Sequence, residues 1–128
     1  MEFPSELRYT KTHEWARRNG NRLRVGITAY AQQEISDVVF VELPKVQLEA
    51  AKGKTIAVVE SVKAAFDIYA PVSGRVVEIN KILESEPALV NQDPYGRGWF
   101  FEIEMANPSE WEGLLTAEHY QSQCTTTP

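Results

Sequence analysis

Residues 55–74 constrain the fold of this chain most strongly, because they predict two strands joined by a short reversal. Residues 56–59 are apolar and mostly β-branched, as in a buried strand, and residues 66–69 form a second, largely apolar segment. Pro71 lacks the N–H that a sheet ladder requires, so the second strand should end before it. Residues 60–65 contain no Gly, Asn or Pro, which disfavours a primed two-residue turn. We therefore predict a hairpin closed by a type I turn, which accepts most residue types.

Lys63 lies at the tip of this predicted hairpin, between the short side chains of Val62 and Ala64. A lysine in such a place has two interpretations. Most surface lysines are solvated charges, and a charge at a strand end discourages edge-to-edge aggregation. The alternative is a lysine presented for covalent loading, as in the swinging-arm carriers of biotin and of lipoate.

The residues around Lys63 closely resemble the H protein of the glycine cleavage system, a lipoyl carrier. Two segments at the expected spacing carry the resemblance, Glu60-Ser61-Val62-Lys63-Ala64 and Asp67-Ile68-Tyr69-Ala70-Pro71-Val72-Ser73-Gly74. In that family the matching lysine carries lipoate. The resemblance therefore implies covalent lipoate on Lys63, with Glu60, Ser61, Val62 and Ala64 as recognition residues around the lysine. Biotin carriers usually have a methionine on each side of the lysine, which this chain lacks.

Length and composition indicate one ordinary globular domain. The chain has 128 residues, of which 43% are hydrophobic and 24% charged, and its net charge is −5. The negative charge argues against a general binder of phosphate backbones, and the apolar runs are too short to cross a bilayer. Residues 1–9 lack the features of a signal or transit peptide. We expect a cytoplasmic bacterial or archaeal protein, although the mature form of a mitochondrial protein would look the same.

The sequence contains no independent catalytic or metal-binding pattern. Its single cysteine, Cys124, cannot form an internal disulfide or a cysteine-based zinc site. His13 and His119 are far apart and lack ligand spacing, and the glycines of residues 95–98 lack the rest of a nucleotide-binding fingerprint. We predict neither a metal site nor catalytic residues.

Turn and cap signals divide the rest of the chain into short elements. Asn19-Gly20 predicts a hairpin, and Thr28 is a candidate N-cap for a helix over residues 29–35. Asn107 should cap another helix, with Pro108 at its first position and Glu110 closing a capping box. The other predicted elements are strands over residues 23–27, 38–43, 76–79 and 99–103, helical turns over 82–90 interrupted at Pro87, a loop over 91–96, a helical stripe of Trp111, Leu114 and Leu115 docking on the sheet, and a short turn over 116–120.

Many short strands with turn signals between them predict a mainly β barrel or sandwich of two small antiparallel sheets. The resemblance implies the same fold, the barrel-sandwich hybrid of lipoyl and biotinyl carriers with short helices and a C-terminal helix. It covers nearly the whole chain and includes residues 9–15, 25–28, 38–44 and 89–96. We expect a single lipoyl-carrier domain over residues 1–122 and a frayed tail over residues 123–128.

The resemblance implies a carrier and not an enzyme. Lipoate on Lys63 would take the aminomethyl group of glycine from a pyridoxal-phosphate decarboxylase (P protein) and pass it to a folate-dependent aminomethyltransferase (T protein). Dihydrolipoamide dehydrogenase (L protein) would reoxidise the dithiol, and a lipoate-attaching enzyme would load the lysine. No nucleic-acid or membrane partner is expected, and we expect a monomer. A tethered arm meets each active site at a raised effective concentration.

In the H-protein family the loaded arm folds against the protein surface. The matching residues here are Thr12, Glu14 and Asp67, which would contact the cationic amine of the cargo and limit access of water. Thr12 stands where Ser is expected, which keeps the hydroxyl. The alternative interpretation makes Glu14 and Asp67 ordinary surface acids and Trp15 a core residue.

Three other functions remain open from the sequence. The protein could be an H-protein-like relay that stores lipoate or passes it to other complexes, since the motif around Lys63 is the same in both cases. It could be a biotin carrier, which the missing methionines disfavour, or an unmodified interaction domain. Among the departures from the family pattern, Phe66 matters most, because it replaces a small residue near the lysine.

Overall fold

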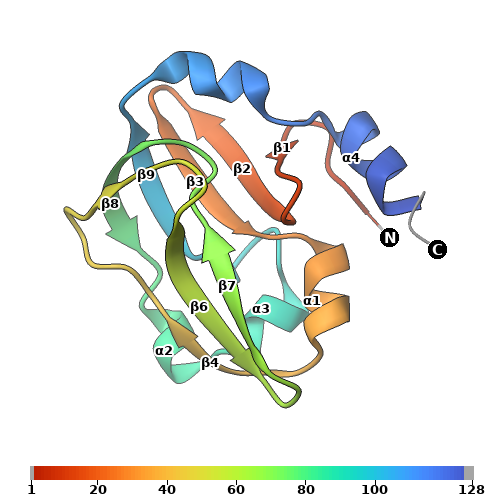
Figure 1. The fold of residues 1–128 in the computed structure, drawn as a ribbon. Helices are drawn as coiled ribbons and strands as arrows, with labels where there is room; N and C mark the ends of the chain where they lie inside the picture. Colours follow the sequence, from red (N-terminus) through yellow and green to blue (C-terminus); the bar gives the residue numbers. More distant parts are fainter. Residues whose placement is uncertain (1, 126–128) are drawn as a thin grey trace.

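Two antiparallel sheets packed against each other form the body of the protein (Figure 1). A computed structural model describes residues 2–125. The six-stranded sheet has the order β1-β2-β3-β9-β8-β5, formed by Arg8–Tyr9, Glu14–Asn19, Arg22–Ile27, Phe101–Met105, Gly74–Ile79 and Glu49–Ala50. The three-stranded sheet has the order β4-β6-β7, formed by Val38–Glu42, Thr55–Ser61 and Ala65–Tyr69. The prediction of two antiparallel sheets with short helices and a C-terminal helix is confirmed.

Short helices connect the strands. Helix α1, Ala29–Ile35, has the predicted bounds, and the Thr28 side chain caps it by accepting a hydrogen bond from the Ala31 N–H. Helices α2, Ile82–Ser85, and α3, Leu89–Gln92, are separated at Pro87 as predicted. None of the helices in the described part of the chain is long and apolar enough to cross a membrane.

Helix α4, Ala117–Thr125, is longer than the turn that the sequence predicted. It continues past residue 122, where we expected the domain to end and a tail to begin. Residues 126–128 of that tail lie outside the described residues. In Figure 1 α4 lies beside the N-terminal segment, at the opposite end of the molecule from the β6–β7 hairpin tip.

The interior consists of two groups of buried side chains. The larger one fills the space between the sheets and includes residues of both, such as Val25, Val59 and Ile103. The smaller one contains Leu7, Tyr9, Trp15 and Tyr120, and the rings of Tyr9 and Tyr120 stack with centroids 4.7 Å apart. This second group fixes α4 against β1 and β2, and residues 10–14 pass beside it.

The helix predicted from Asn107 is a 3-10 helix, Pro108–Gly113, and the predicted capping box is wrong. Asn107 caps it, but the Glu110 carboxylate accepts hydrogen bonds from the backbone N–H and hydroxyl of Ser73, at 2.7 and 3.3 Å. The predicted helical stripe is also wrong, because Leu114 and Leu115 follow the helix, and Leu115 pairs with Tyr9. Glu110 thus accepts from the distant Ser73 instead of from the local N–H of a capping box.

The loop predicted over residues 91–96 begins two residues later, because Asn91 and Gln92 belong to α3. The Asn91 amide donates to the Ser36 carbonyl at 2.8 Å, and its oxygen accepts from the Val38 N–H at 2.9 Å. The helical conformation of Asn91 therefore fixes the connection between α1 and β4, next to the lysine hairpin.

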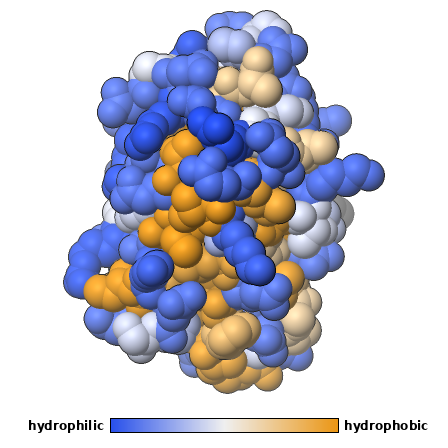
Figure 2. All heavy atoms as spheres, turned by 90° about the vertical axis from the view of Figure 1, so that its left-hand side faces the viewer, coloured by the Kyte–Doolittle hydropathy of each residue, from blue (hydrophilic) through white to orange (hydrophobic). Residues whose placement is uncertain are grey.

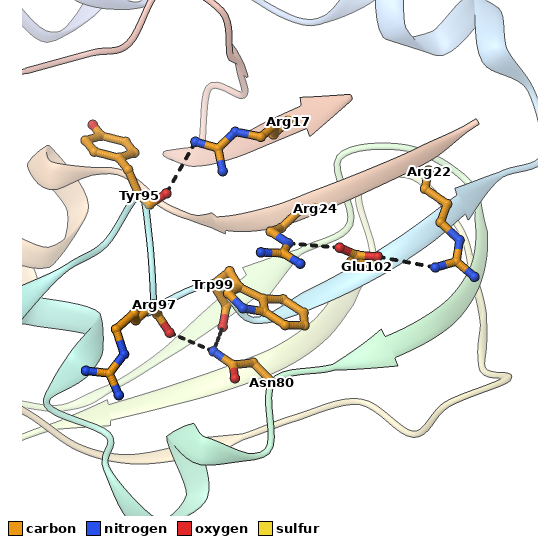
Figure 3. Close-up of polar contacts among 8 residues, drawn as sticks. All are labelled: Arg17, Arg22, Arg24, Asn80, Tyr95, Arg97, Trp99 and Glu102. Atoms are coloured by element: carbon orange, nitrogen blue, oxygen red, sulfur yellow. Dashed lines mark hydrogen bonds and ion pairs between the residues drawn. The ribbon is translucent and has the colours of Figure 1, made fainter. Parts of the chain in front are cut away.

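A polar cluster ties the segment before β9 to the larger sheet (Figure 3). Glu102 bridges Arg22 and Arg24 with N···O distances of 3.5 and 2.8 Å, and the Arg24 guanidinium lies 4.3 Å from the Trp99 ring centroid. The Asn80 amide donates to the Trp99 carbonyl at 2.8 Å. None of these contacts involves Lys63.

Candidate functional site

Lys63 stands at the tip of the β6–β7 hairpin, and the side chain of Ser61 builds the turn. The buried Ser61 hydroxyl oxygen accepts hydrogen bonds from the backbone N–H groups of Lys63 and Ala64, at 3.1 and 3.4 Å. No residue from 62 to 64 has a positive φ. The hairpin thus reverses without glycine, as the sequence predicted, because a serine oxygen takes the two N–H groups of the turn.

A second set of contacts holds the tip against the end of α1. The Val62 N–H donates to the Asp37 carbonyl at 3.0 Å, and the Lys63 ammonium donates to the Glu34 carbonyl at 3.0 Å. The last carbonyls of a helix carry partial negative charge and favour a cation. Lys63 is exposed and forms no ion pair with the described residues. Its amine is therefore accessible on a backbone that is fixed from two sides.

Apolar side chains lie exposed beside the tip. A bulge between Val38 and Phe40 leaves the successive residues Val39 and Phe40 both at the surface, with 55% and 47% exposure, and Val62 is 67% exposed. Figure 2 shows apolar side chains reaching the lower end of the molecule, where the hairpin tip lies in Figure 1. Glu60 is exposed on β6. Large exposed apolar groups of this kind are typical of contact surfaces.

A pocket of about 290 Å³, here called the near cleft, runs from α1 along β7. Glu34, whose carbonyl holds the Lys63 ammonium, is one of its lining residues. Apolar side chains form most of its wall, and Asp67 lies on the β7 side. Phe66, the residue that replaces an expected small side chain, is half-buried and is part of this wall.

A second pocket of about 520 Å³, the far cleft, lies beyond the near cleft. Thr12 lines both pockets, whereas Glu14 and Tyr69 line only the far one. Tyr69 is six residues from Lys63, roughly 20 Å along an extended strand, so the far cleft lies at the other end of the hairpin. Thr12 therefore marks the boundary between the two clefts.

Glu14 is a buried acid in a site built to receive its charge. It is 1% exposed; one carboxylate oxygen accepts from the Thr10 and Thr12 hydroxyls, each at 2.5 Å, and the other accepts from the Tyr69 N–H at 3.1 Å. Burial raises the pKa of the Glu14 carboxyl above its ordinary value, and hydrogen bonds from Thr10, Thr12 and Tyr69 oppose that rise.

The structure brings Thr12 and Glu14 into direct contact but places Asp67 on the near cleft, where it is exposed. Glu14 is not a surface acid, so that part of the alternative interpretation is wrong. Trp15 is a core residue, as that interpretation held, and its indole N–H donates to the Pro94 carbonyl at 2.9 Å.

The resemblance placed the segment from Thr12 to Trp15 beside the arm but did not single out His13, which lines the near cleft. Sequence reasoning dismissed this histidine because no metal-ligand spacing surrounds it. The positions of Tyr30 and Glu34, one helical turn apart and both lining the near cleft, were the only signal that α1 presents a face there.

Comparison with known proteins decides the family. A family model described as Glycine cleavage H-protein matches residues 7–127. The chain belongs to the glycine cleavage H-protein family. A Glycine cleavage system H protein of Thermus thermophilus is 54% identical over 121 residues, which are 94% of each chain. That of Symbiobacterium thermophilum is 52% identical over 119 residues, or 93% of each chain.

A solved structure of this family has the same fold. The crystal structure of a glycine cleavage system H protein from Mycobacterium marinum matches with a TM-score of 0.88 at 36% sequence identity, covering 96% of this chain and 99% of that one. The barrel-sandwich fold that the resemblance implied is confirmed.

Proposed function

We propose that this H-protein-family chain is the lipoyl carrier of glycine cleavage and that lipoate is joined to Lys63 through an amide bond. The observation that carries the proposal is an exposed primary amine on a fixed hairpin tip, held by the carbonyl of Glu34, a residue that lines the near cleft. An amide nitrogen keeps one N–H and can still donate to the Glu34 carbonyl. The residues present therefore fit the group.

The carrier would move the aminomethyl group of glycine between enzymes. When bound, lipoate supplies the sulfur chemistry, accepting the group at a pyridoxal-phosphate decarboxylase and giving it up at a folate-dependent aminomethyltransferase. Dihydrolipoamide dehydrogenase and a lipoate-attaching enzyme complete the set of partners. The contribution of this chain is to tether and shield the cargo, and no residue of it is assigned a catalytic role.

Thr12, Glu14 and Asp67 are the proposed contacts for the cargo. An aliphatic amine is cationic at neutral pH, and a partly buried carboxylate is a strong acceptor for it. Glu34, which accepts from the Lys63 ammonium, lines the near cleft together with Asp67 and Thr12. Thr12 donates to Glu14. Enclosing the amine there would limit the access of water, which otherwise releases formaldehyde and ammonia.

Recognition by the partner enzymes is assigned to the residues around the tip. Glu60, Val62 and Ala64 are exposed, whereas Ser61 is buried and acts by shaping the turn. Each enzyme that contacts Lys63 must approach across these side chains. Acidic groups at such a rim steer association with basic surfaces.

Intact mass spectrometry of protein from a lipoylation-competent host tests the proposal. We expect one lipoyl adduct on wild type and none on Lys63→Arg, which keeps the charge and removes the acylatable amine. The two proteins should unfold at the same urea concentration, because the Lys63 side chain is exposed. A lipoylated Lys63→Arg variant, or a biotin mass on wild type, contradicts the proposal.

A loaded protein that the glycine decarboxylase does not use as substrate would instead support the lipoate relay. One assay separates the two functions. It measures the exchange of the glycine carboxyl carbon with labelled bicarbonate by a glycine decarboxylase of the glycine cleavage system, with the loaded protein present.

A further inference from the structure

His13 connects the near cleft to a buried chain of hydrogen bonds. Its Nδ1 lies 2.7 Å from the Tyr120 hydroxyl oxygen, and that oxygen lies 2.7 Å from the hydroxyl oxygen of Thr28. The Thr28 oxygen also accepts from the Ala31 N–H at 3.1 Å, since Thr28 is the N-cap of α1. The chain thus runs from the start of α1 through α4 to the imidazole ring.

The direction of this chain follows from counting donors. Thr28 is fully buried, and the described hydrogen bonds of its side-chain hydroxyl reach only Ala31 and Tyr120. Because the Ala31 N–H must donate, the Thr28 hydroxyl proton has Tyr120 as its acceptor. The Tyr120 hydroxyl in turn has two candidate acceptors, His13 Nδ1 and the Cys124 sulfur. An imidazole nitrogen accepts more strongly than a thiol sulfur, so the Tyr120 proton is assigned to Nδ1. The opposite direction would leave the Thr28 proton unpaired in the core, at a cost of about 1–3 kcal/mol. His13 therefore carries its proton on Nε2.

Nδ1 of His13 points at Tyr120, which does not line the near cleft, so Nε2 is the ring nitrogen that can face that cleft. His13 lines that cleft together with Tyr30 and Glu34 of α1, whereas Tyr120 does not line it. The rings of His13 and Tyr30 lie with centroids 4.8 Å apart. No hydrogen bond joins Nε2 to a described residue, so its N–H is available to an occupant of the cleft.

The backbone at His13 is strained in a way that keeps the ring in place. Its φ is 75°, in the left-handed region that non-glycine residues rarely adopt. The His13 carbonyl accepts from the Thr28 N–H at 3.0 Å, and its own N–H donates to the Thr10 carbonyl at 3.2 Å. Strained residues of this kind cluster at functional sites.

Burial of the ring favours a neutral imidazole, against the pull of the acids beside it. Burial lowers the pKa of the His13 ring, and the Glu34 carboxylate opposes this. Glu34 on α1 and Asp67 on β7 are the acids that line the same cleft. A neutral ring donates a hydrogen bond without repelling a cationic cargo amine.

We propose that the Nε2–H of His13 donates a hydrogen bond to the amide carbonyl oxygen formed when Lys63 is acylated. This rests on the proposed lipoyl attachment. The amide oxygen is the only strong acceptor on such an arm, because its sulfur atoms accept weakly. The Lys63 amine lies at the Glu34 carbonyl, and Glu34 lines the cleft together with His13. His13 is thus a positioning residue that holds the arm along the near cleft.

The tautomer is measured first, on unloaded protein, from the side-chain ¹⁵N shifts of His13. We expect the Nε2–H form in wild type and a mixture of both forms in Tyr120→Phe, which deletes the donor to Nδ1. Tyr95→Phe is the matched control, because it deletes another hydroxyl that bonds near the start of α1. An Nδ1–H form in wild type overturns the inference, as does a tautomer that Tyr120→Phe leaves unchanged.

Loading Lys63 with lipoate is the second step. We expect the Nε2 resonance to shift and its proton to exchange with water about tenfold more slowly, the factor that corresponds to about 1.4 kcal/mol. His13→Asn should accept lipoate at the wild-type rate, since Asn tolerates a positive φ, but it has no Nε2–H to donate to the arm. A lipoylated protein with unchanged Nε2 signals refutes only the role of His13. A Lys63 that never becomes lipoylated refutes the carrier function as well.

Discussion

Replacing Glu14 with glutamine should separate the stability of the protein from its protection of the cargo. Glutamine has the same shape and keeps one acceptor oxygen, but it has no negative charge. That oxygen can accept from the Tyr69 N–H, which is fixed in the backbone. The Thr10 and Thr12 hydroxyls can rotate and accept from the amide –NH₂ group. Every polar group therefore keeps a partner.

The expected stability changes follow from this count. We expect the free energy of unfolding of Glu14→Gln to lie within about 1 kcal/mol of the wild-type value at neutral pH. Glu14→Ala leaves the Tyr69 N–H without its acceptor, which should cost about 1–3 kcal/mol, while the two threonine hydroxyls, 3.2 Å apart, bond to each other. Urea unfolding measures both. An equal loss of unfolding free energy in the two variants would refute this count of hydrogen-bond partners.

The direction in which the free energy of unfolding changes with pH tests the same site. Because burial raises the pKa of folded Glu14, the folded protein binds more protons than the unfolded chain above the ordinary pKa of 4.5. The free energy of unfolding should therefore fall as the pH rises from 4.5 through the raised pKa of Glu14, and then level off. Glu14→Gln should lack this contribution in urea titrations over that range.

Protection of the cargo is measured as formaldehyde release from aminomethyl-loaded protein. A hydrogen bond to a charged group contributes about 1.5–3 kcal/mol, so its loss in Glu14→Gln should lower the occupancy of the docked arm by roughly 10- to 100-fold. Asp67→Ala should also release faster, whereas Glu60→Gln, an exposed acid that lines neither cleft, should match wild type. Equal release rates in wild type, Glu14→Gln and Asp67→Ala would refute the protective cleft.

Three further changes probe the hairpin and the core. Glu60→Lys should slow lipoylation, followed by intact mass, more than it lowers the melting temperature; the reverse would make Glu60 merely structural. Ser61→Ala removes the acceptor of two turn N–H groups, so we expect a loss of about 1 kcal/mol in urea unfolding and slower lipoylation of Lys63; wild-type values for both would contradict this. Gly26→Ala places a methyl 2.7 Å from the buried Trp15 ring and should cost about 1–3 kcal/mol in the same assay, whereas Gly113→Ala, with 3.7 Å to its nearest neighbour, should not.

The hairpin was predictable because its determinants are local. Two apolar strands, a turn segment without glycine and a proline that ends the second strand all lie within twenty residues. The sequence also predicted the Thr28 cap, which a side chain and a nearby N–H form by themselves. The identity of the Ser61 oxygen as the group that builds the turn was not predicted.

The errors have long-range causes. Glu110 has the right spacing for a capping box, but Ser73, 37 residues away, offers two donors to its carboxylate. Val39 and Phe40 lie in an apolar run that predicts burial, and only the bulge in the β4–β6 pairing exposes both. The proposed role of His13 depends on its contact with Tyr120, 107 residues along the chain, so no local pattern identifies it.

If the cargo docks at Glu14 as proposed, the burial of this acid would let the protein distinguish a loaded arm from an unloaded one. In the unloaded protein burial works against the charge of this carboxylate, and three hydrogen bonds offset only part of that cost. A cationic amine at Thr12 would lower the pKa of Glu14, and by linkage the ionised carboxylate would bind the amine. An arm without an amine gains nothing from this charge. We therefore expect the loaded arm to stay docked and the arm to leave the cleft once its cargo has been transferred, because the attraction depends on the charge of the cargo itself.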